Sequence, residues 1–112
     1  MNYRYSDLSV EQLLQLVGEF KEKAQKAEQL GNISEVQIYE RKMQLALAYT
    51  LNPEDYHPGN TYEFRHDPGH RFRINYLEGV FAWGHRINLL DEEYEKEEAI
   101  PISLLGKKLD EK

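Results

Sequence analysis

A chain of 112 residues, of which 40% are hydrophobic and 30% charged, has the composition of one globular domain, which excludes a disordered chain and a membrane protein. It has no cysteine, which excludes disulfides and thiolate chemistry, and its polar start carries no secretory pattern, so a cytoplasmic setting is expected. The net charge of −6 argues against general polyanion binding.

The first half of the chain has the periodicity of two amphipathic helices. Ser9 followed by Gln12 is a capping-box spacing, and a helix is predicted from about Val10 to Leu30. Gly31-Asn32 suits a left-handed helix end, and Ser34 is the predicted cap of a second helix. Apolar positions recur along one side of each helix: Leu13, Val17, Phe20, Ala24 and Ala27 in the first, and Val36, Tyr39, Met43, Ala46 or Leu47, and Thr50 in the second. The short link predicts an antiparallel hairpin, which must pack on another element because two helices alone cannot enclose a core.

The second half of the chain changes to a period of two. Strands are predicted at residues 61–65, 71–78 and 80–87, with turns in HDPGH and LEG. The acidic run DEEYEKEE (91–98) is predicted to be a solvated loop, and residues 98–108 a short strand interrupted by Pro101 and then one helical turn. Strands this short need closure against further strands, so the prediction is an α+β protein whose helical hairpin and linker (1–56) pack on a small barrel (57–112) in one compact domain.

Four segments carry a resemblance to a known family: KAEQLGNISE, ERKMQLALAYTLNPEDYHPGNTY, INYLEGVFAWGHR and EEAIPISLL. Together they resemble the YfhH family, small uncharacterised proteins of Bacillus-type bacteria, over nearly the whole chain. The resemblance implies an SH3-like barrel preceded by a helical hairpin and a cytoplasmic setting, and no activity. A weaker likeness to SH3 domains is generic: Trp83 in a middle strand, an acidic loop, and Ile100-Pro101 before the last strand.

The register of the 71–87 hairpin decides what its aromatic residues do, and the sequence leaves two registers open. With a two-residue turn at Glu78-Gly79, Tyr76, Phe81 and Trp83 face the core, and Arg71, Arg73 and Arg86 stand together outside. With a three-residue loop, Tyr76 pairs with Val80 and faces the core, while Phe81 and Trp83 project outward. Small residues suit a tapering barrel interior, which favours the second register; the first helix would then be able to cover the exposed aromatics.

The other candidate groups have ordinary explanations. The three arginines could grip phosphate or carboxylate groups, but a solvated face paired with nearby acids is the simpler interpretation. His66 and His70 flank one turn, with His57 or Asp55 nearby, yet they match no zinc spacing, so no metal site is predicted. Glu54, Asp55 and His57 lack a nucleophile or cofactor motif beside them, and Tyr56 is expected to dock between the helices and the barrel.

The predicted function is therefore that of a non-enzymatic cytoplasmic interaction module without a cofactor. Its mechanism would be recognition of a protein or peptide by an aromatic patch of Trp83, Phe81, Tyr62 and Pro101, with the acidic loop selecting a basic partner. The alternative is a nucleic-acid-binding regulator that uses Arg71, Arg73 and Arg86. A helical face left uncovered would support a homodimer, and no membrane partner is expected.

Overall fold

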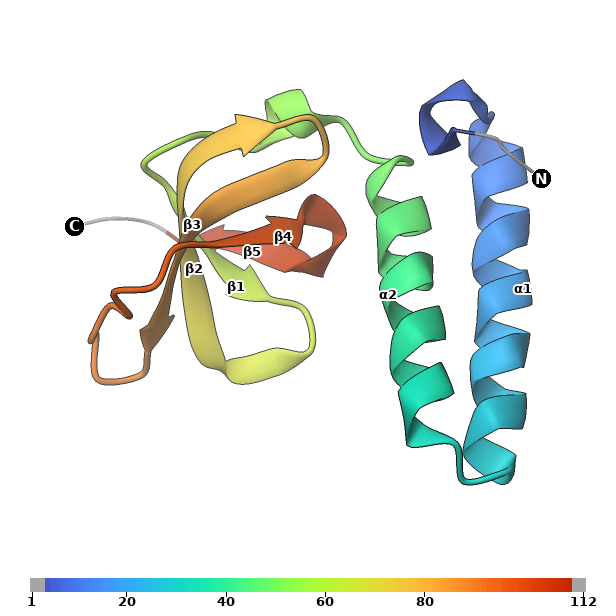
Figure 1. The fold of residues 1–112 in the computed structure, drawn as a ribbon. Coiled ribbons are helices and arrows are strands. Elements are labelled where there is room, and N and C mark those ends of the chain that lie inside the picture. Colours follow the sequence, from blue (N-terminus) through green and yellow to red (C-terminus); the bar gives the residue numbers. More distant parts are fainter. Residues whose placement is uncertain (1–3, 110–112) are drawn as a thin grey trace. The chain divides into compact units, whose positions relative to one another are not determined.

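The computed structural model describes residues 4–109 of the chain, which divides into two compact units, Met1–Thr50 and Leu51–Lys112. The first unit is helical and the second is a β-sheet, so the protein belongs to the α+β class (Figure 1). Residues 51–56, predicted as the linker, lie in the second unit. Among residues 4–109, neither helix is both long enough and apolar enough to cross a bilayer.

The helical unit is an antiparallel hairpin of α1 (Val10–Gln29) and α2 (Ile33–Ala48), preceded by a short 3-10 turn at Tyr5–Asp7. The capping box is confirmed, because the Ser9 hydroxyl accepts from the Gln12 amide and the Gln12 side chain accepts from the Ser9 amide. Asn32 rather than Ser34 caps α2, since its side chain accepts from the Glu35 amide at 3.2 Å. The predicted Ser34 cap was wrong by two residues, and Ser34 lies inside the first helical turn.

The core of the helical unit follows the predicted stripes. Its buried centre is Leu13, Phe20 and Ala46. Partly buried side chains pack around this centre from both helices and the preceding turn: Tyr5, Leu8, Leu16, Val17, Tyr39, Met43 and Tyr49. The Phe20 and Tyr39 rings stack with centroids 6.4 Å apart, which joins the two helices near the middle of the hairpin.

The second unit is a five-stranded antiparallel sheet in the order β4-β3-β2-β1-β5. Its strands are β1 (Thr61–Phe64), β2 (Asp67–Glu78), β3 (Phe81–Asn88), β4 (Glu98–Pro101) and β5 (Leu105–Leu109). Short 3-10 turns at Pro53–Asp55 and Ile102–Leu104 precede β1 and β5. The turn predicted in HDPGH was misplaced: Phe64 pairs with Asp67, so the turn is Arg65-His66 and the Asp-Pro-Gly segment already belongs to β2.

The expected closed SH3-like barrel is not confirmed. Within the described part of the chain β4 pairs with β3 and β5 pairs with β1, and no pairing joins β4 to β5, so the sheet is open. The strands nevertheless wrap around a shared inner face instead of lying flat (Figure 1). That face is buried: Tyr62, Phe64, Phe72, Ile74, Val80, Ala82, Ile100, Ile102 and Leu105 are each no more than 8% exposed.

Candidate functional site

The β2–β3 hairpin follows neither register derived from the sequence. The two strands meet at a two-residue turn, Gly79-Val80, with Glu78 opposite Phe81 and with Gly79 at φ +59°, a backbone region that suits glycine. Further along, Ile74 pairs with Gly84 but Tyr76 pairs with Trp83, so Asn75 is an extra residue that forms a β-bulge. The bulge changes which side chains face the core.

The bulge places Tyr76 on the outer face of the sheet. Phe72 and Ile74, on one side of the bulge, are 0% and 1% exposed, whereas Tyr76 is 42% exposed. The register with a three-residue loop predicted Phe72, Ile74, Val80 and Ala82 in the core together with Tyr76, and all of these except Tyr76 are buried. Phe81 and Trp83 lie on the outer face, as that register also predicted. The missed signal was Gly84: a glycine inside a strand often marks a bulge or a close backbone approach. A Cβ at Gly84 would lie 1.9 Å from the Arg73 carbonyl oxygen.

An aromatic pair is the most prominent feature of this outer face. The Tyr76 and Trp83 rings stack with centroids 5.8 Å apart and planes 6° from parallel. Trp83 also pairs with Ala99 across β4, and Phe81 pairs with Pro101. We call Tyr76, Phe81, Trp83 and Pro101 the aromatic patch; it spans β2, β3 and β4.

Tyr62, predicted as part of that patch, does not belong to it. Its side chain is buried, 3% exposed, and its hydroxyl accepts a hydrogen bond from the His57 amide at 3.0 Å. Its ring packs against Tyr56, with centroids 5.6 Å apart. Tyr62 alternates with Thr61 and Glu63 so that it shares the inner face with Phe72, its direct partner on β2. It is therefore a core residue of the sheet.

The three arginines do not form one patch. Arg71 and Arg73 lie on the outer face and form ion pairs with Asp91 and Glu93. Arg86 pairs across the strands with Phe72, which places it on the inner side. Its guanidinium carbon is 4.5 Å from the centroid of the Phe64 ring. It also donates to Glu98 at 2.9 Å and lies 3.7 Å from Asp67. The expectation that all three stand together outside was wrong, because it depended on an unbulged register.

The acidic run is exposed over residues 91–97, as expected of a solvated loop, but specific contacts tie it to the sheet, and its last residue, Glu98, begins β4. The Tyr94 amide donates to the Arg86 carbonyl at 2.8 Å, and the Tyr94 carbonyl accepts from His85 Nδ1 at 2.9 Å. At its end, Glu97 accepts from the Asn75 side chain at 2.8 Å. With the two ion pairs of Asp91 and Glu93, these contacts hold the run against β2 and β3. We call residues 91–97 the acidic strap; it covers the arginine end of the outer face.

The charge next to the aromatic pair is negative. Partial burial, followed by the charges of Glu97 and Glu78, raises the pKa of the Tyr76 hydroxyl above its ordinary value of 10.0. Glu78 precedes the hairpin turn on the same strand as Tyr76, and Glu97 is held beside Asn75 by its hydrogen bond. Within residues 4–109, neither carboxylate forms an ion pair.

The histidines are dispersed into separate local contacts. His70 donates through Nδ1 to Asp67 at 2.8 Å, and its Nε2 lies 3.0 Å from the Tyr94 hydroxyl. His85 binds the strap, and the His57 amide binds Tyr62. The described residues include no group of three or more His, Cys, Asp or Glu side chains placed to hold a metal ion.

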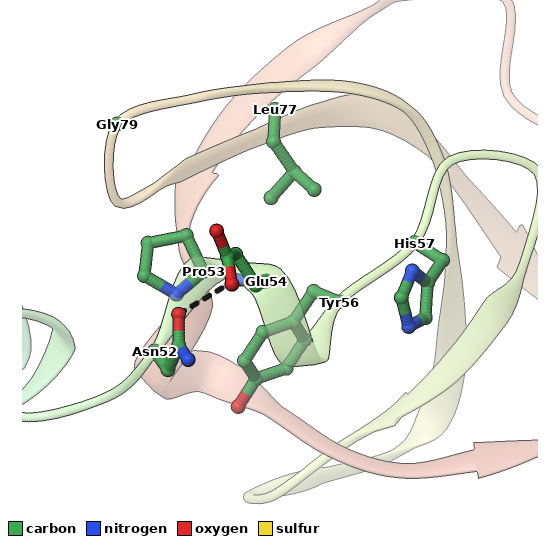
Figure 2. Close-up of a pocket in the computed structure, with 7 residues that line it drawn as sticks. All are labelled: Asn52, Pro53, Glu54, Tyr56, His57, Leu77 and Gly79. Atoms are coloured by element: carbon green, nitrogen blue, oxygen red, sulfur yellow. Dashed lines mark hydrogen bonds between the residues drawn. The ribbon is translucent and has the colours of Figure 1, made fainter.

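A shallow hollow of about 710 Å³ lies beside the hairpin turn, on the other side of the sheet from the aromatic pair. Its lining residues are Asn52, Pro53, Glu54, Tyr56, His57, Leu77 and Gly79 (Figure 2). The Asn52 side chain accepts from the Glu54 amide at 2.9 Å and shapes the 3-10 turn. Figure 2 shows the His57 ring apart from the Glu54 carboxylate, and within the described range no hydrogen bond joins them. The base-and-orienter contact considered from the sequence is therefore not formed between Glu54 and His57.

The fold and site together define an α+β protein with a helical hairpin, a five-stranded antiparallel sheet and an aromatic patch on the outer face of that sheet. Residues 3–106 match the family described as "Protein of unknown function (DUF1811)", and the chain belongs to this family. It is 46% identical over 108 residues to "Uncharacterized protein YfhH" of Bacillus subtilis (strain 168), which covers 96% of this chain and 99% of that relative. The resemblance drawn from the sequence motifs is thus confirmed.

Proposed function

We propose that this protein is a non-enzymatic interaction module that binds a segment of another protein through the aromatic patch. The observation that carries the proposal is the stacked Tyr76–Trp83 pair on the outer face. The core of the sheet is filled from the inner face by other side chains, so these two large rings are not required there. Aromatic residues are enriched in the buried centres of protein interfaces, where they contribute much of the binding energy.

The proposal includes an SH3-like topology for the sheet unit. Three features support it: the strand order β4-β3-β2-β1-β5, a long β2 that pairs with both β1 and β3, and a 3-10 turn between β4 and β5. Small barrels of this type carry many unrelated functions, so the topology supports a binding role only together with the patch. The cytoplasmic setting and the homodimer stay predictions.

Solvent access of the single tryptophan tests the proposal directly. We expect iodide to quench Trp83 fluorescence, because its ring lies on the outer face and is not part of the core. A blue-shifted Trp83 that iodide cannot reach would mean that this face is covered within the protein itself. That result would overturn the proposal.

Binding is then tested with a display library of random peptides, selected on the wild-type protein and counter-selected on Trp83→Ala. The matched control is Leu90→Ala, which removes a 79% exposed apolar side chain from the β3–β4 connection of the same unit. We expect enriched peptides to bind the wild type and the control equally and to lose at least tenfold in affinity for Trp83→Ala, which circular dichroism should show to be folded. Peptides that bind all three proteins alike would contradict the proposal.

The alternative, nucleic-acid binding through Arg71, Arg73 and Arg86, is not favoured by the arrangement of these residues. Two are paired with the acidic strap, and the third contacts the Phe64 ring on the inner side. Binding of phosphates would have to displace carboxylates of the same chain. Salt-sensitive binding of single-stranded nucleic acid that weakens on Arg71→Gln or Arg73→Gln would revive this alternative.

A further inference from the structure

We infer that the Tyr76–Trp83 pair receives a positively charged side chain of the bound protein segment, an arginine in the first place. The inference rests on the proposed function and names the chemistry of the partner. It joins two observations at one place: a stacked aromatic pair in which Tyr76 is 42% exposed, and two carboxylates that form no ion pair within residues 4–109.

The rings supply the first part of the site. The face of an aromatic ring is electronegative and attracts cations that approach within about 6 Å of its centroid, with tryptophan the strongest such ring. Tyr76 and Trp83 stack nearly parallel, so each ring keeps one face that its partner does not cover, and a cation can approach the pair at such a face. Elsewhere in the chain the same attraction is already used, because Lys42 lies 5.6 Å from the centroid of the Tyr39 ring and Arg86 lies over Phe64.

The carboxylates supply the second part. Two acidic groups of the strap form ion pairs with the sheet, Asp91 with Arg71 and Glu93 with Arg73, while Glu92 between them accepts from the neutral Asn88 side chain. Near the aromatic pair, Glu97 accepts from the neutral Asn75 side chain and Glu78 lies before the hairpin turn, and neither forms an ion pair with another residue of 4–109. Glu97 bonds to the neighbour of Tyr76, and Glu78 lies two residues beyond it on the same strand, so both charges would attract a cation seated at the Tyr76 ring. The same two charges would repel phosphate or an acidic peptide.

Arginine fits this combination better than lysine. Its guanidinium is planar, stacks on aromatic faces, and can donate two parallel hydrogen bonds to one carboxylate. A guanidinium over Trp83 could bond edge-on to Glu78 or Glu97 while its face stays on the rings. The ammonium of lysine would make the electrostatic contact without the stacking.

The test follows the Trp83 indole N–H in two-dimensional NMR spectra during titration with a glycine–serine peptide that carries arginine, and with the same peptide carrying citrulline. Citrulline keeps the shape and removes the charge. We expect the arginine peptide to move the Trp83 signal saturably and the citrulline peptide to bind at least tenfold more weakly. Added salt should weaken the arginine peptide's binding, since the attraction is partly between exposed charges.

Two variants that each remove one carboxylate test whether Glu97 and Glu78 attract the arginine. Glu97→Gln removes the carboxylate but keeps an oxygen that can accept from Asn75. Glu78→Gln removes the second carboxylate, at the hairpin turn. We expect each to weaken the arginine peptide by about two- to fivefold, the range of a single exposed ion pair. Glu95→Gln is the matched control, because Glu95 lies in the same strap and forms no ion pair or hydrogen bond within the described residues. It should leave the affinity unchanged.

The outcomes separate this inference from the proposed function. Equal binding of the arginine and citrulline peptides, or no effect of the glutamine variants, would overturn the cation site and leave a neutral aromatic patch. Library peptides that require Trp83 but contain no basic residue would do the same. If neither the arginine peptide nor any library peptide moves the Trp83 signal, both proposals fail. Binding of nucleic acid at Trp83 would also overturn the cation site.

Discussion

The two faces of the β2–β3 hairpin carry similar large side chains and use them in different ways. On the inner face, Phe72 and Ile74 are 0% and 1% exposed and lie opposite Arg86 and Gly84. On the outer face, two residues further along, Tyr76 and Trp83 stack on each other with Tyr76 still 42% exposed. One extra residue, Asn75, separates the two arrangements. Burial is thus decided by the position of a side chain relative to the bulge, and hydrophobicity alone would not distinguish the two groups.

The outer face itself divides into two ends. At one end the acidic strap neutralises Arg71 and Arg73, and the strap backbone bonds to β3. At the other end, beside the aromatic pair, Glu97 of the strap bonds to the neutral Asn75 side chain, and neither Glu97 nor Glu78 forms an ion pair within residues 4–109. The first end contributes to the structure of the sheet unit, and the second is where a partner has groups left to bind.

Truncation on the inner face should have the largest effect on stability. Phe72→Ala is expected to lower the free energy of unfolding by about 3–5 kcal/mol, because it leaves a cavity in a fully buried site. Trp83→Ala should lower it by about 1–2 kcal/mol, since it loses the ring pair and partial burial. Urea unfolding followed by circular dichroism measures both. Equal losses would mean that Trp83 is a core residue and that the two faces do not differ.

The next largest effect on stability is expected at Gly84, where β3 comes close to the backbone of β2 at the bulge. Gly84→Ala is expected to cost about 1–3 kcal/mol or more, because the new methyl group would meet the Arg73 carbonyl oxygen and the strands must move apart. Gly18→Ala is the control in the helical unit, where a Cβ would meet nothing within 4 Å. It should be neutral or stabilising, since alanine favours a helix. A neutral Gly84→Ala would show that the strands are further apart than described.

The ion pairs of the acidic strap should contribute less to the free energy of unfolding than the packing at Phe72 or Gly84. Asp91→Asn removes the ion pair with Arg71 and keeps a residue that tolerates the positive φ of 62° at this position. We expect a loss of about 0.2–1 kcal/mol that disappears in high salt, as for an exposed pair. Glu95→Gln makes the same change of charge without breaking an ion pair and should have no effect. A loss that persists in high salt would point to packing of the strap and away from its charges.

The smallest expected effect is the contribution of Asp67 to the pH dependence of folding stability. The hydrogen bond from His70, partly opposed by burial, holds the pKa of Asp67 below its ordinary value of 3.8. The folded protein therefore favours the carboxylate, so this contribution to stability is complete above pH 3.8 and is lost as pH falls through the lower folded-state pKa. Carboxyl NMR titration of Asp67 measures that value directly. In Asp67→Asn, unfolding should depend less on pH in this range; an Asp67 that titrates at 3.8 or above would contradict the hydrogen bond.

Much of the architecture could be read from local patterns. The capping box, the apolar stripes of α1 and α2 and the strands around 61–64, 71–78 and 81–87 all depend on residues close together in sequence. The candidate site was harder to find. Phe81, Trp83 and Pro101 were placed correctly on one face, whereas Tyr62 was assigned to the surface and Tyr76 to the core of the favoured register. Both errors concern pairing between strands, which local sequence determines weakly.

By itself the sequence determined an α+β chain with a helical hairpin and antiparallel strands, because caps and hydrophobic periods act within a few residues. Only the tertiary structure decided three further features: the bulge at Asn75, the side of the sheet that Arg86 takes, and the pairing of the strap's acids with Arg71 and Arg73. Each depends on groups from different strands meeting in space. A one-residue change in pairing turns a side chain to the opposite face, and no local pattern records that change.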